Sequence, residues 1–354
     1  MTQPAPATQP SAPAPTEEAG SRIHLDVRTL IYRYGLLVVL VGLIIFFAAT
    51  QPAFGTWRNG IIIMQSVSIV AIVALGVTVS LAADGFDLSV GANVGFVVML
   101  TTSVMVVHDF PAVLAVFVGL LAGAGIGVFN GLLIVKGRVP DLLATLGTMF
   151  LFLGLTLMMT SGQSVSQGMP IDDQGTPAPG KVWPEFLWLG RGEIFFDIRV
   201  SVVVMIIIFV VVWVFLEHTR WGRTIYAIGG NREAARLAGI RVDRMRVLAY
   251  VISGVLAATG GILLAARLGR GDVGAGEPFL LEAVAAALIG FAVLGANRPN
   301  AFGTFIGAVF VGVLINGLTM SGFPYYTQDF VKGALLVAAL VMSFSTLFRG
   351  SRAT

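Results

Sequence analysis

The sequence predicts an all-α polytopic membrane protein, and three observations lead to this prediction. Of the 354 residues, 56% are hydrophobic and only 12% are charged, whereas a soluble domain carries about 25% charged residues. Several apolar runs approach or exceed the ~20 residues with which a helix spans a bilayer. Seven of the 22 Lys and Arg residues are concentrated in one segment between two such runs, residues 217–246.

Ten transmembrane spans are expected, and together they make residues 34–348 a membrane domain. Their approximate ranges are 34–50, 61–83, 88–107, 111–135, 141–161, 198–216, 246–268, 279–297, 301–320 and 330–348. The two spans over residues 88–135 are closely spaced, so a broken or re-entrant helix is the alternative there.

The two ends of the chain are expected to lie in the cytoplasm. Residues 1–20 are rich in Pro, Ala and Thr and lack large apolar side chains, so they cannot bury enough surface to fold. They also lack the basic start and early apolar core of a signal peptide. We therefore expect residues 1–33 to form a disordered tail and residues 349–354 to form a short C-terminal tail.

The arginine-rich segment 217–246 fixes the orientation of the other segments. A charged side chain at the centre of a spanning helix costs roughly 2.5 to 3.5 kcal/mol, so seven arginines place this segment outside the bilayer. A run of positive charge marks the cytoplasmic side. With this segment inside, fifteen Lys and Arg residues fall on the cytoplasmic side and seven on the outer side, which agrees with the positive-inside rule.

The same segment contains the pattern of a short capped helix. Gly229 and Gly230 are expected to break the chain, Asn231 to cap a helix over residues 232–238, and Gly239 to end it. The small and the basic side chains of this helix fall on opposite faces: Ala234, Ala235 and Ala238 against Arg232 and Arg236. Glu233 falls in the first turn, where the helix dipole favours negative charge, and Asp243 is expected to cap the next helix. Such a helix is shaped to dock into another protein, and the alternative is a solvated basic loop that binds nothing.

Residues 229–240, GGNREAARLAGI, resemble the coupling loop of ABC-importer permeases that serve ribose, xylose, arabinose and related monosaccharides. In that family the loop docks on the ATP-binding subunit. The resemblance implies that these residues couple the chain to an ATPase: Asn231, Arg232, Glu233, Ala234, Ala235, Arg236 and Gly239.

Further matches extend the resemblance from about residue 61 to 348. They are DGFDLSVG at 84–91, NGLLI at 130–134, Val139-Pro140 and ATLG at 144–147. One region departs from the family: its members usually have a Gly-rich turn after the eighth span, and here residues 295–300 read GANRPN.

The resemblance also implies partners and the energy source. It implies a second permease subunit, identical or different, a cytoplasmic ATP-binding subunit that holds ATP and magnesium, and an external substrate-binding protein. No cofactor is expected on this chain. Residues 175–182 match the first seven positions of a P-loop, but Val182 replaces the Ser or Thr that would ligate magnesium and no strand–helix context surrounds it.

Other chemistry is excluded by composition. The absence of cysteine rules out disulfides and thiol chemistry. The three histidines, His24, His108 and His218, are too far apart in sequence to suggest a metal cluster. No nucleophile–base pair is recognisable, so we expect no enzyme activity. The net charge of +3 reflects the cytoplasmic arginines and does not indicate nucleic-acid binding.

Two sets of residues inside the spans are candidates for defined roles. Four glycines recur every four residues on one helix face and predict close helix packing: Gly119, Gly123, Gly127 and Gly131. Polar residues in the spans are candidates for the translocation pathway, or alternatively for hydrogen bonds between helices: Gln65, Asp87, Asn93, Asn130, Glu282 and Asn316.

A short internal repeat suggests a further symmetry. Asn130-Gly131-Leu132 precedes Val139-Pro140, and Asn316-Gly317-Leu318 precedes Phe323-Pro324. The two tripeptides end spans four and nine, and an offset of five spans would invert one half relative to the other. Inverted repeats are a transporter architecture.

The sequence therefore favours the membrane-spanning permease subunit of an ABC importer for a monosaccharide, in the bacterial cytoplasmic membrane. The alternatives are a branched-chain amino acid permease of related architecture and, from a different class, an ion-coupled secondary transporter. The sequence does not identify the sugar.

Overall fold

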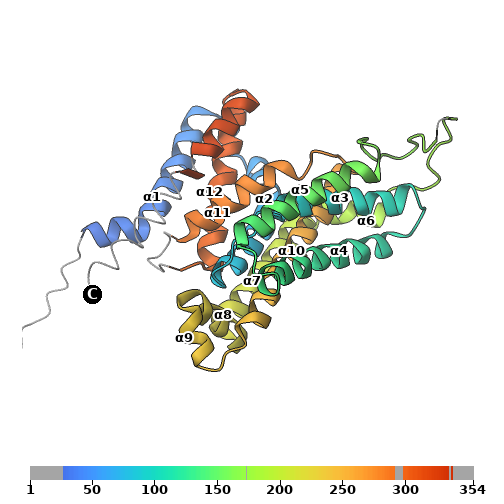
Figure 1. Ribbon diagram of the computed structural model, residues 1–354. Helices are drawn as coiled ribbons and strands as arrows, with labels where there is room; N and C mark the ends of the chain where they lie inside the picture. Colours follow the sequence, from blue (N-terminus) through green and yellow to red (C-terminus); the bar gives the residue numbers. More distant parts are fainter. Residues whose placement is uncertain (1–26, 173, 292–297, 335, 338–354) are drawn as a thin grey trace, which may run out of the picture.

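The computed structural model describes residues 27–172, 174–291, 298–334 and 336–337, and these residues are helical apart from their connections (Figure 1). The helices are α1 (Val27–Thr50), α2 (Trp57–Ala82), α3 (Val90–Val106), α4 (Ala112–Val135), α5 (Asp141–Met159), α6 (Pro184–Arg191), α7 (Val200–His218), α8 (Arg220–Gly230), α9 (Arg232–Leu237), α10 (Val242–Leu268), α11 (Glu277–Phe291) and α12 (Ala301–Met320), with a single 3₁₀ turn at Phe195–Asp197. Residues 325–334 and 336–337 are also helical. Only isolated β-bridges, and no strands, occur in these ranges.

Six of the described helices are long and apolar enough to cross a membrane: α2, α4, α5, α7, α10 and α12. The chain is therefore an all-α membrane protein. Two further apolar stretches, Tyr34–Thr50 of α1 and Val90–Val106, are shorter. The described part of α11 ends at Phe291 and the expected last span runs beyond residue 337, so the ten-span count is not established by the described residues.

Helix α1 starts outside its expected range, whereas the expected division of residues 88–135 into two helices is confirmed. Helix α1 begins at Val27, inside the stretch expected as a tail, while residues 1–26 lie outside the described residues. The stretch 88–135 forms two separate helices, α3 and α4, joined by a short turn. Every residue of α3 except Leu100 is buried, so this short helix lies inside the bundle.

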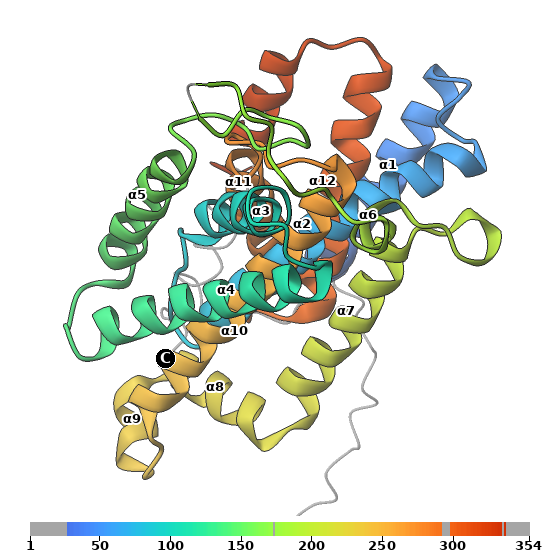
Figure 2. The same ribbon diagram turned by 90° about the vertical axis from the view of Figure 1, so that its right-hand side faces the viewer.

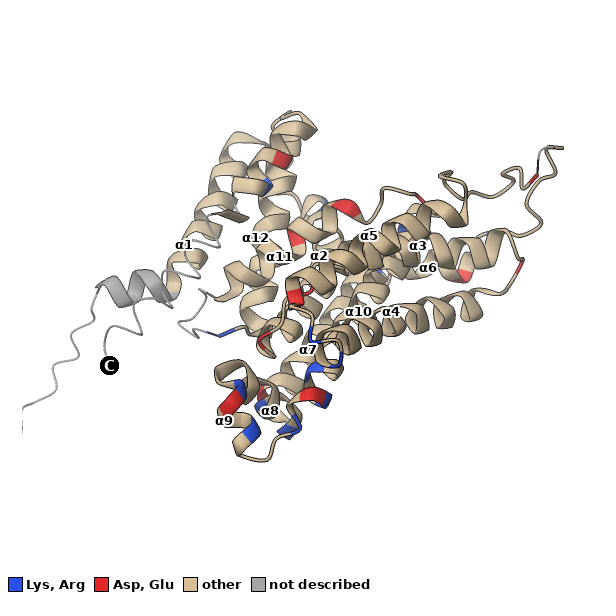
Figure 3. Cartoon of the chain, in the orientation of Figure 1, with Lys and Arg blue, Asp and Glu red and all other residues tan. Residues whose placement is uncertain are grey.

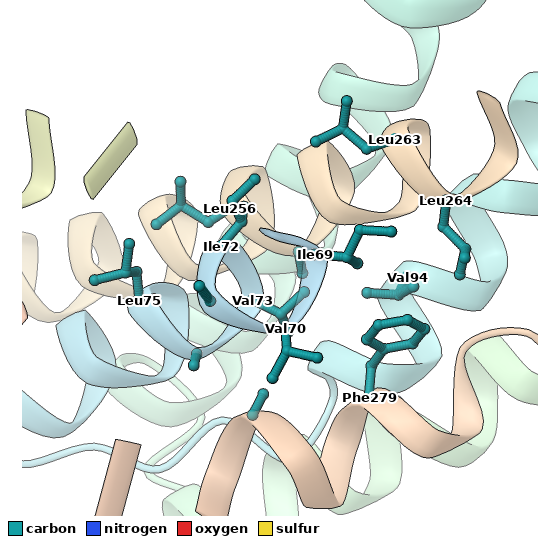
Figure 4. Packing of buried hydrophobic residues seen from close by; sticks show 14 of the residues in the cluster. Ile69, Val70, Ile72, Val73, Leu75, Val94, Leu256, Leu263, Leu264 and Phe279 are labelled. Carbon is teal, nitrogen blue, oxygen red and sulfur yellow. The ribbon is translucent and has the colours of Figure 1, made fainter. Parts of the chain in front are cut away.

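Helix α10 is the central element of the bundle. It packs against α2, α3 and α4, and its Gly269 end contacts α6. Figure 4 shows the apolar side chains at this centre, contributed by α2, α3, α10 and α11: Ile69, Val70, Ile72, Val73, Leu75, Val94, Leu256, Leu263, Leu264 and Phe279. The side chains that these helices present to one another are mostly aliphatic, so their shape determines how closely the helices approach.

Helices α4 and α10 approach each other at backbone distance. A Cβ on Gly123 would lie 2.5 Å from the carbonyl oxygen of Gly254, and one on Gly131 would lie 2.9 Å from the Cα of Val247. Gly119 faces both Thr101 of α3 and Ile262 of α10. The four glycines singled out in the sequence therefore lie against α10 or its neighbour α3, where a side chain would not fit.

This contact predicts a position-specific loss of stability. A Cβ on Gly127 would lie 2.7 Å from the Cα of Val251 and closer still to the carbonyl oxygen of Tyr250, whereas one on Gly125 meets nothing within 4 Å. We expect Gly127→Ala to lower the free energy of unfolding by about 1–3 kcal/mol, because backbone cannot move aside as a side chain can. Thermal unfolding of the detergent-solubilised protein measures this.

Gly125→Ala is the matched control, since it makes the same substitution two residues away on an open face of α4. It should leave the unfolding midpoint unchanged or raise it slightly, because Ala favours helix over Gly by about 1 kcal/mol. Equal midpoints for the two variants would contradict the backbone contact.

Candidate functional site

Helices α8 and α9 project from one end of the bundle, opposite the end where the α5–α6 connection extends (Figure 1 and Figure 2). Figure 3 shows that Lys and Arg gather on these two helices and on the neighbouring start of α10. Helix α8 begins at the cap Thr219, whose hydroxyl accepts from the amide of Gly222, and it buries Gly222, Ile225 and Ile228. The segment expected as a loop thus contains an additional amphipathic helix that holds α9 at a fixed place.

Helix α9 has the caps that its sequence predicts. The Asn231 side chain accepts a hydrogen bond from the amide of Ala234 at 2.9 Å. Gly239 follows with φ of 80°, the left-handed conformation in which glycine commonly ends a helix. A six-residue helix is too short to be stable alone, so it depends on these caps and on its contacts with the bundle.

Two local expectations were wrong. Gly229 and Gly230 do not break the chain but form the last residues of α8. The absence of a side chain on Gly229 serves packing, because a Cβ there would collide with the carbonyl oxygen of Ala82 at the end of α2. Asp243 does not cap α10, because the cap position is Arg241. Asp243 lies in the first turn of the helix, where the helix dipole stabilises its negative charge.

One side of α9 is anchored to the bundle. The Nε of Arg232 lies 2.7 Å from a carboxylate oxygen of Asp84, and its guanidinium also donates to the Asp84 carbonyl oxygen. Ala235 is buried in a small apolar cluster with Ile228 and Val242. These contacts join α9 to the turn after α2 and to the start of α10, so α9 cannot shift without displacing both elements.

The other side of α9 is open. The side chains of Glu233, Ala234, Arg236 and Ala238 are exposed, and Leu237 is 88% exposed. The expected division into a small face and a basic face therefore does not hold, since Ala235 faces inward while Ala234 and Ala238 face outward. An isolated, almost fully exposed leucine on a basic polar surface is the feature that the sequence interpretation missed.

A second ion pair lies next to the first and is buried. Arg246 of α10 contacts a carboxylate oxygen of Asp141 at 2.5 Å, with only 8% and 18% of the two side chains exposed. The hydroxyl of Tyr250 donates to the same oxygen at 2.7 Å. Gly85 leaves the space for this arrangement, because a Cβ there would lie 2.6 Å from the Tyr250 hydroxyl. The pair joins the start of α5 to α10.

Partial burial affects the acidic group of the outer pair, whose side chain is 56% exposed. It raises the pKa of the Asp84 carboxyl above its ordinary value, while the nearby Arg232 and Arg246 guanidinium groups act in the opposite direction. Ionising Asp84 therefore costs more than ionising a free carboxyl, and the positive charge of Arg232 offsets part of that cost.

Further into the bundle, α10 contacts a fully buried carboxylate. Asp87 is 1% exposed and accepts from Ser253 of α10 at 2.8 Å and from the hydroxyl of Ser89 at 2.6 Å. Ser89 in turn accepts from the side-chain amide of Asn130 at 2.8 Å. Asn93 donates to the carbonyl oxygen of Gly254 at 3.1 Å. Three of the expected pathway residues, Asp87, Asn93 and Asn130, thus belong to one polar cluster between α3, α4 and α10.

The other expected pathway residues lie apart from this cluster. Glu282 forms an ion pair with Lys332 at 2.9 Å, Asn316 accepts from Asn59 at 3.1 Å, and Gln65 donates to the carbonyl oxygen of Gly190 at 3.1 Å. Each of these side chains therefore bonds another element, which is the alternative that the sequence left open. Their role in translocation stays a prediction.

The end of α7 is held by a third charged contact. Arg298 lies 2.8 Å from a carboxylate oxygen of Glu217 and stacks over the ring of Tyr226, 4.3 Å from its centroid. Burial and the neighbouring Glu217 raise the pKa of the Tyr226 hydroxyl far above its ordinary value, so it remains a donor to Glu217 at 3.1 Å. Arg298 belongs to the turn that departs from the family pattern, and residues 295–297 of that turn lie outside the described residues.

Two exclusions made from the sequence fall on the described part of the chain. Residues 175–182 lie in the α5–α6 connection. Helix α6 begins at Pro184, but no strand precedes this segment among the described residues, as a P-loop would require. No group of three or more His, Asp or Glu side chains that could hold a metal ion occurs among the described residues. His108 lies in the turn after α3, His218 is the last residue of α7, and His24 lies outside the described residues.

The family assignment comes from comparison with known proteins. Residues 60–340 match the family model described as "Branched-chain amino acid transport system / permease component". The chain belongs to this family. It is 37% identical to the ribose import permease protein RbsC of Bacillus subtilis (strain 168) over 321 residues, which cover 91% of this chain and 95% of that protein.

Two other relatives cover the chain to a similar extent. The ribose import permease protein RbsC of Escherichia coli (strain K12) is 34% identical over 92% of this chain and 98% of its own length. The D-allose transport system permease protein AlsC of the same organism is 30% identical over 88% of this chain and 91% of its own length. No solved structure matches the chain.

The two neighbouring ion pairs predict different costs for the same substitution. We expect Arg246→Gln to lower the free energy of unfolding by about 3–5 kcal/mol, because it leaves the Asp141 carboxylate buried without its cation. Arg232→Gln should cost less than about 1 kcal/mol, because the Arg232–Asp84 pair is exposed to water. Thermal unfolding of both variants in the same detergent tests the ranking, and the reverse order would contradict the burial of the inner pair.

Proposed function

We propose that this chain is the membrane-spanning permease subunit of an ABC importer that translocates a monosaccharide. The observation that carries the proposal is the similarity, over about nine-tenths of the chain, to permeases named for ribose and allose import. The chain is a transport subunit and not an enzyme, so ATP hydrolysis and its magnesium belong to a partner subunit. A polar sugar cannot cross lipid, so it passes between packed helices.

In this proposal α9 is the helix on which the ATP-binding subunit docks. Its exposed Leu237 and Arg236 offer an apolar contact and a charge to a partner, while its inner side is fixed by Arg232 and Ala235. A displacement of α9 would move the end of α2 through the Arg232–Asp84 ion pair, and the start of α10 through the covalent connection between α9 and α10. ATP binding on the partner would then shift the population between outward-facing and inward-facing arrangements of the helices.

The orientation of the chain forms part of the proposal. The end of the bundle that carries α8 and α9 would face the cytoplasm, since it holds the arginine-rich segment and since positive charge marks that side. Both termini would then also lie in the cytoplasm, and the membrane would be the bacterial cytoplasmic membrane. The α5–α6 connection at the opposite end would face the external substrate-binding protein.

Ten spans arranged as an inverted repeat complete the proposed architecture. The shorter helices α1, α3 and α11 and the helix that starts at residue 325 would supply the remaining four. The helix contacts support the repeat: α4 packs on α10 as α12 packs on α2, and α3 packs on α10 as α11 packs on α2. Exchanging α2, α3 and α4 for α10, α11 and α12 therefore preserves the pattern of contacts. A second permease subunit, identical or different, would complete the pore.

Two alternatives make different predictions. A branched-chain amino acid permease agrees with the description of the family model, but the similar relatives named above carry sugar names. An ion-coupled secondary transporter would need no ATPase. We expect uptake of labelled ribose by cells to collapse on ATP depletion and to persist for a time after an uncoupler is added. Uptake of labelled leucine instead, or collapse with the uncoupler alone at unchanged ATP, would overturn the proposal.

The docking role of α9 predicts the effect of a surface substitution. We expect Leu237→Asp to lower the affinity for the ATP-binding subunit at least about 30-fold, because truncating or charging an anchor at the centre of an interface costs about 2 kcal/mol or more. Co-purification of the ATP-binding subunit with the tagged chain in mild detergent measures this. Arg236→Glu should act in the same direction and uncouple ATPase activity from transport.

Arg58→Glu is the control for this experiment. Arg58 is an exposed arginine at the start of α2, at the far end of that helix from Asp84, so the change reverses the same charge away from α9. It should leave co-purification unchanged. Full co-purification with Leu237→Asp would show that the partner does not bind α9.

A further inference from the structure

A cleft of about 560 Å³ lies between α9 and the turn that joins α4 to α5. Its lining residues are Ile134, Val135, Arg138, Val139, Pro140, Asp141, Arg232, Arg236, Asp243 and Arg246. A cleft of this size is comparable with those that hold small ligands. It separates the helix that we propose to couple to the ATPase from the ends of two membrane helices.

The lining of the cleft is rich in arginine. Four guanidinium groups line it with two carboxylates, and two acids outside the lining, Asp84 and Glu233, pair with Arg232 and Arg236. Asp141 is bound by Arg246, and Asp243 lies 3.5 Å from Arg236 in an exposed pair. No ion pair or hydrogen bond joins the Arg138 side chain to any other described residue. Arg138 is therefore the arginine of the lining that no acid of the described residues uses, and the pairs of Arg236 are long and exposed.

Arg246, which also lines the cleft, is buried and has one donor without an acceptor. Arg246 is 7% exposed, and one amino group of its guanidinium binds Asp141, yet its Nε has no hydrogen-bond partner among the described residues. A buried donor without a partner destabilises the folded protein. An anion in the cleft would lie near this guanidinium and would be attracted by its charge.

The cleft also lies at the edge of an exposed apolar surface. Helices α4 and α5 have only 33% and 22% of their most apolar windows buried inside the protein. Directly beside the cleft, Leu132 is 39%, Leu142 53% and Leu143 63% exposed. If these leucines contact lipid tails, the arginines at the ends of α4 and α5 lie at the level of the lipid headgroups.

We propose that this cleft binds the phosphate of an anionic phospholipid whose acyl chains lie on the leucines of α4 and α5. Guanidinium groups are suited to phosphate because they donate paired, charge-assisted hydrogen bonds. Basic pockets beside membrane helices on the cytoplasmic side are suited to acidic headgroups. The phosphate would bridge Arg138 of the α4–α5 turn and Arg236 of α9, near the guanidinium of Arg246.

This bridge would tie the position of α9 to the lipid composition of the inner leaflet. Lipid binding itself is independent of the proposed import function, whereas an effect of the lipid on coupling rests on that proposed function. The binding measurement therefore comes first, because its failure and the failure of the import proposal are distinguishable.

The test compares Arg138→Gln with Lys136→Gln. Both variants remove one positive charge from the same exposed turn, but Lys136 does not line the cleft. Each protein is purified from nanodiscs that contain phosphatidylcholine with or without phosphatidylglycerol, and retained lipid is counted by native mass spectrometry. We expect Arg138→Gln to lower retained phosphatidylglycerol about fivefold, which corresponds to ~1 kcal/mol for one cation at the surface, and Lys136→Gln to retain it as the unaltered protein does.

Three further results bear on the proposal. Arg138→Lys should retain part of the bound lipid, because it keeps the charge but loses the paired donors. Equal losses for Arg138→Gln and Lys136→Gln would overturn the site, since they would indicate general surface charge. Inorganic phosphate or glycerol 3-phosphate could instead protect the detergent-solubilised protein against thermal unfolding. Protection that depends on Arg138 and that phosphatidylglycerol does not match would overturn the lipid as the source of the phosphate.

Discussion

The close contact between α4 and α10 is the constraint on which the rest of the structure depends. Lipid tails are as apolar as the side chains they would replace, so helices in a bilayer associate through fit and not through hydrophobic burial alone. Gly123, Gly127 and Gly254 remove the side chains that would separate the two backbones. Once α4 is fixed in this way, the Asn130 side chain is placed against Ser89, and Asp87 is enclosed.

The same helix, α10, connects the surface to the buried centre. From its first turns inward it presents Arg246 to Asp141, Tyr250 to the same carboxylate, and Ser253 to Asp87. The Arg232–Asp84 pair joins α9 to the segment that carries Asp87. Asp87 accepts hydrogen bonds from the α2–α3 turn and from α10. A displacement of α9 would therefore displace both of these elements. This is a physical route by which a partner on α9 could change the packing of buried helices.

Local features of this protein could be predicted from the sequence, whereas features that join distant segments could not. The cap at Asn231 and the stop at Gly239 follow from rules within a few residues, and both are present. Asp84 and Arg232 are separated by 148 positions, and nothing in either local sequence indicates their pairing. Gly229 was misread because a glycine that breaks a helix and one that lets a neighbouring backbone approach look the same in sequence. The exposure of Leu237 depends on which side of α9 faces the bundle, which only the fold determines.

The central claim is that α9 is the docking site of an ATP-binding subunit. The chain contains no cysteine, so a single introduced thiol can be cross-linked without background. The most direct measurement is therefore bifunctional cross-linking from Leu237→Cys in native membranes, with Arg58→Cys as the distant control. The account predicts that Leu237→Cys is joined to an ATP-binding protein and that Arg58→Cys is not. No such product from Leu237→Cys, in membranes where the variant still imports its substrate, would contradict it.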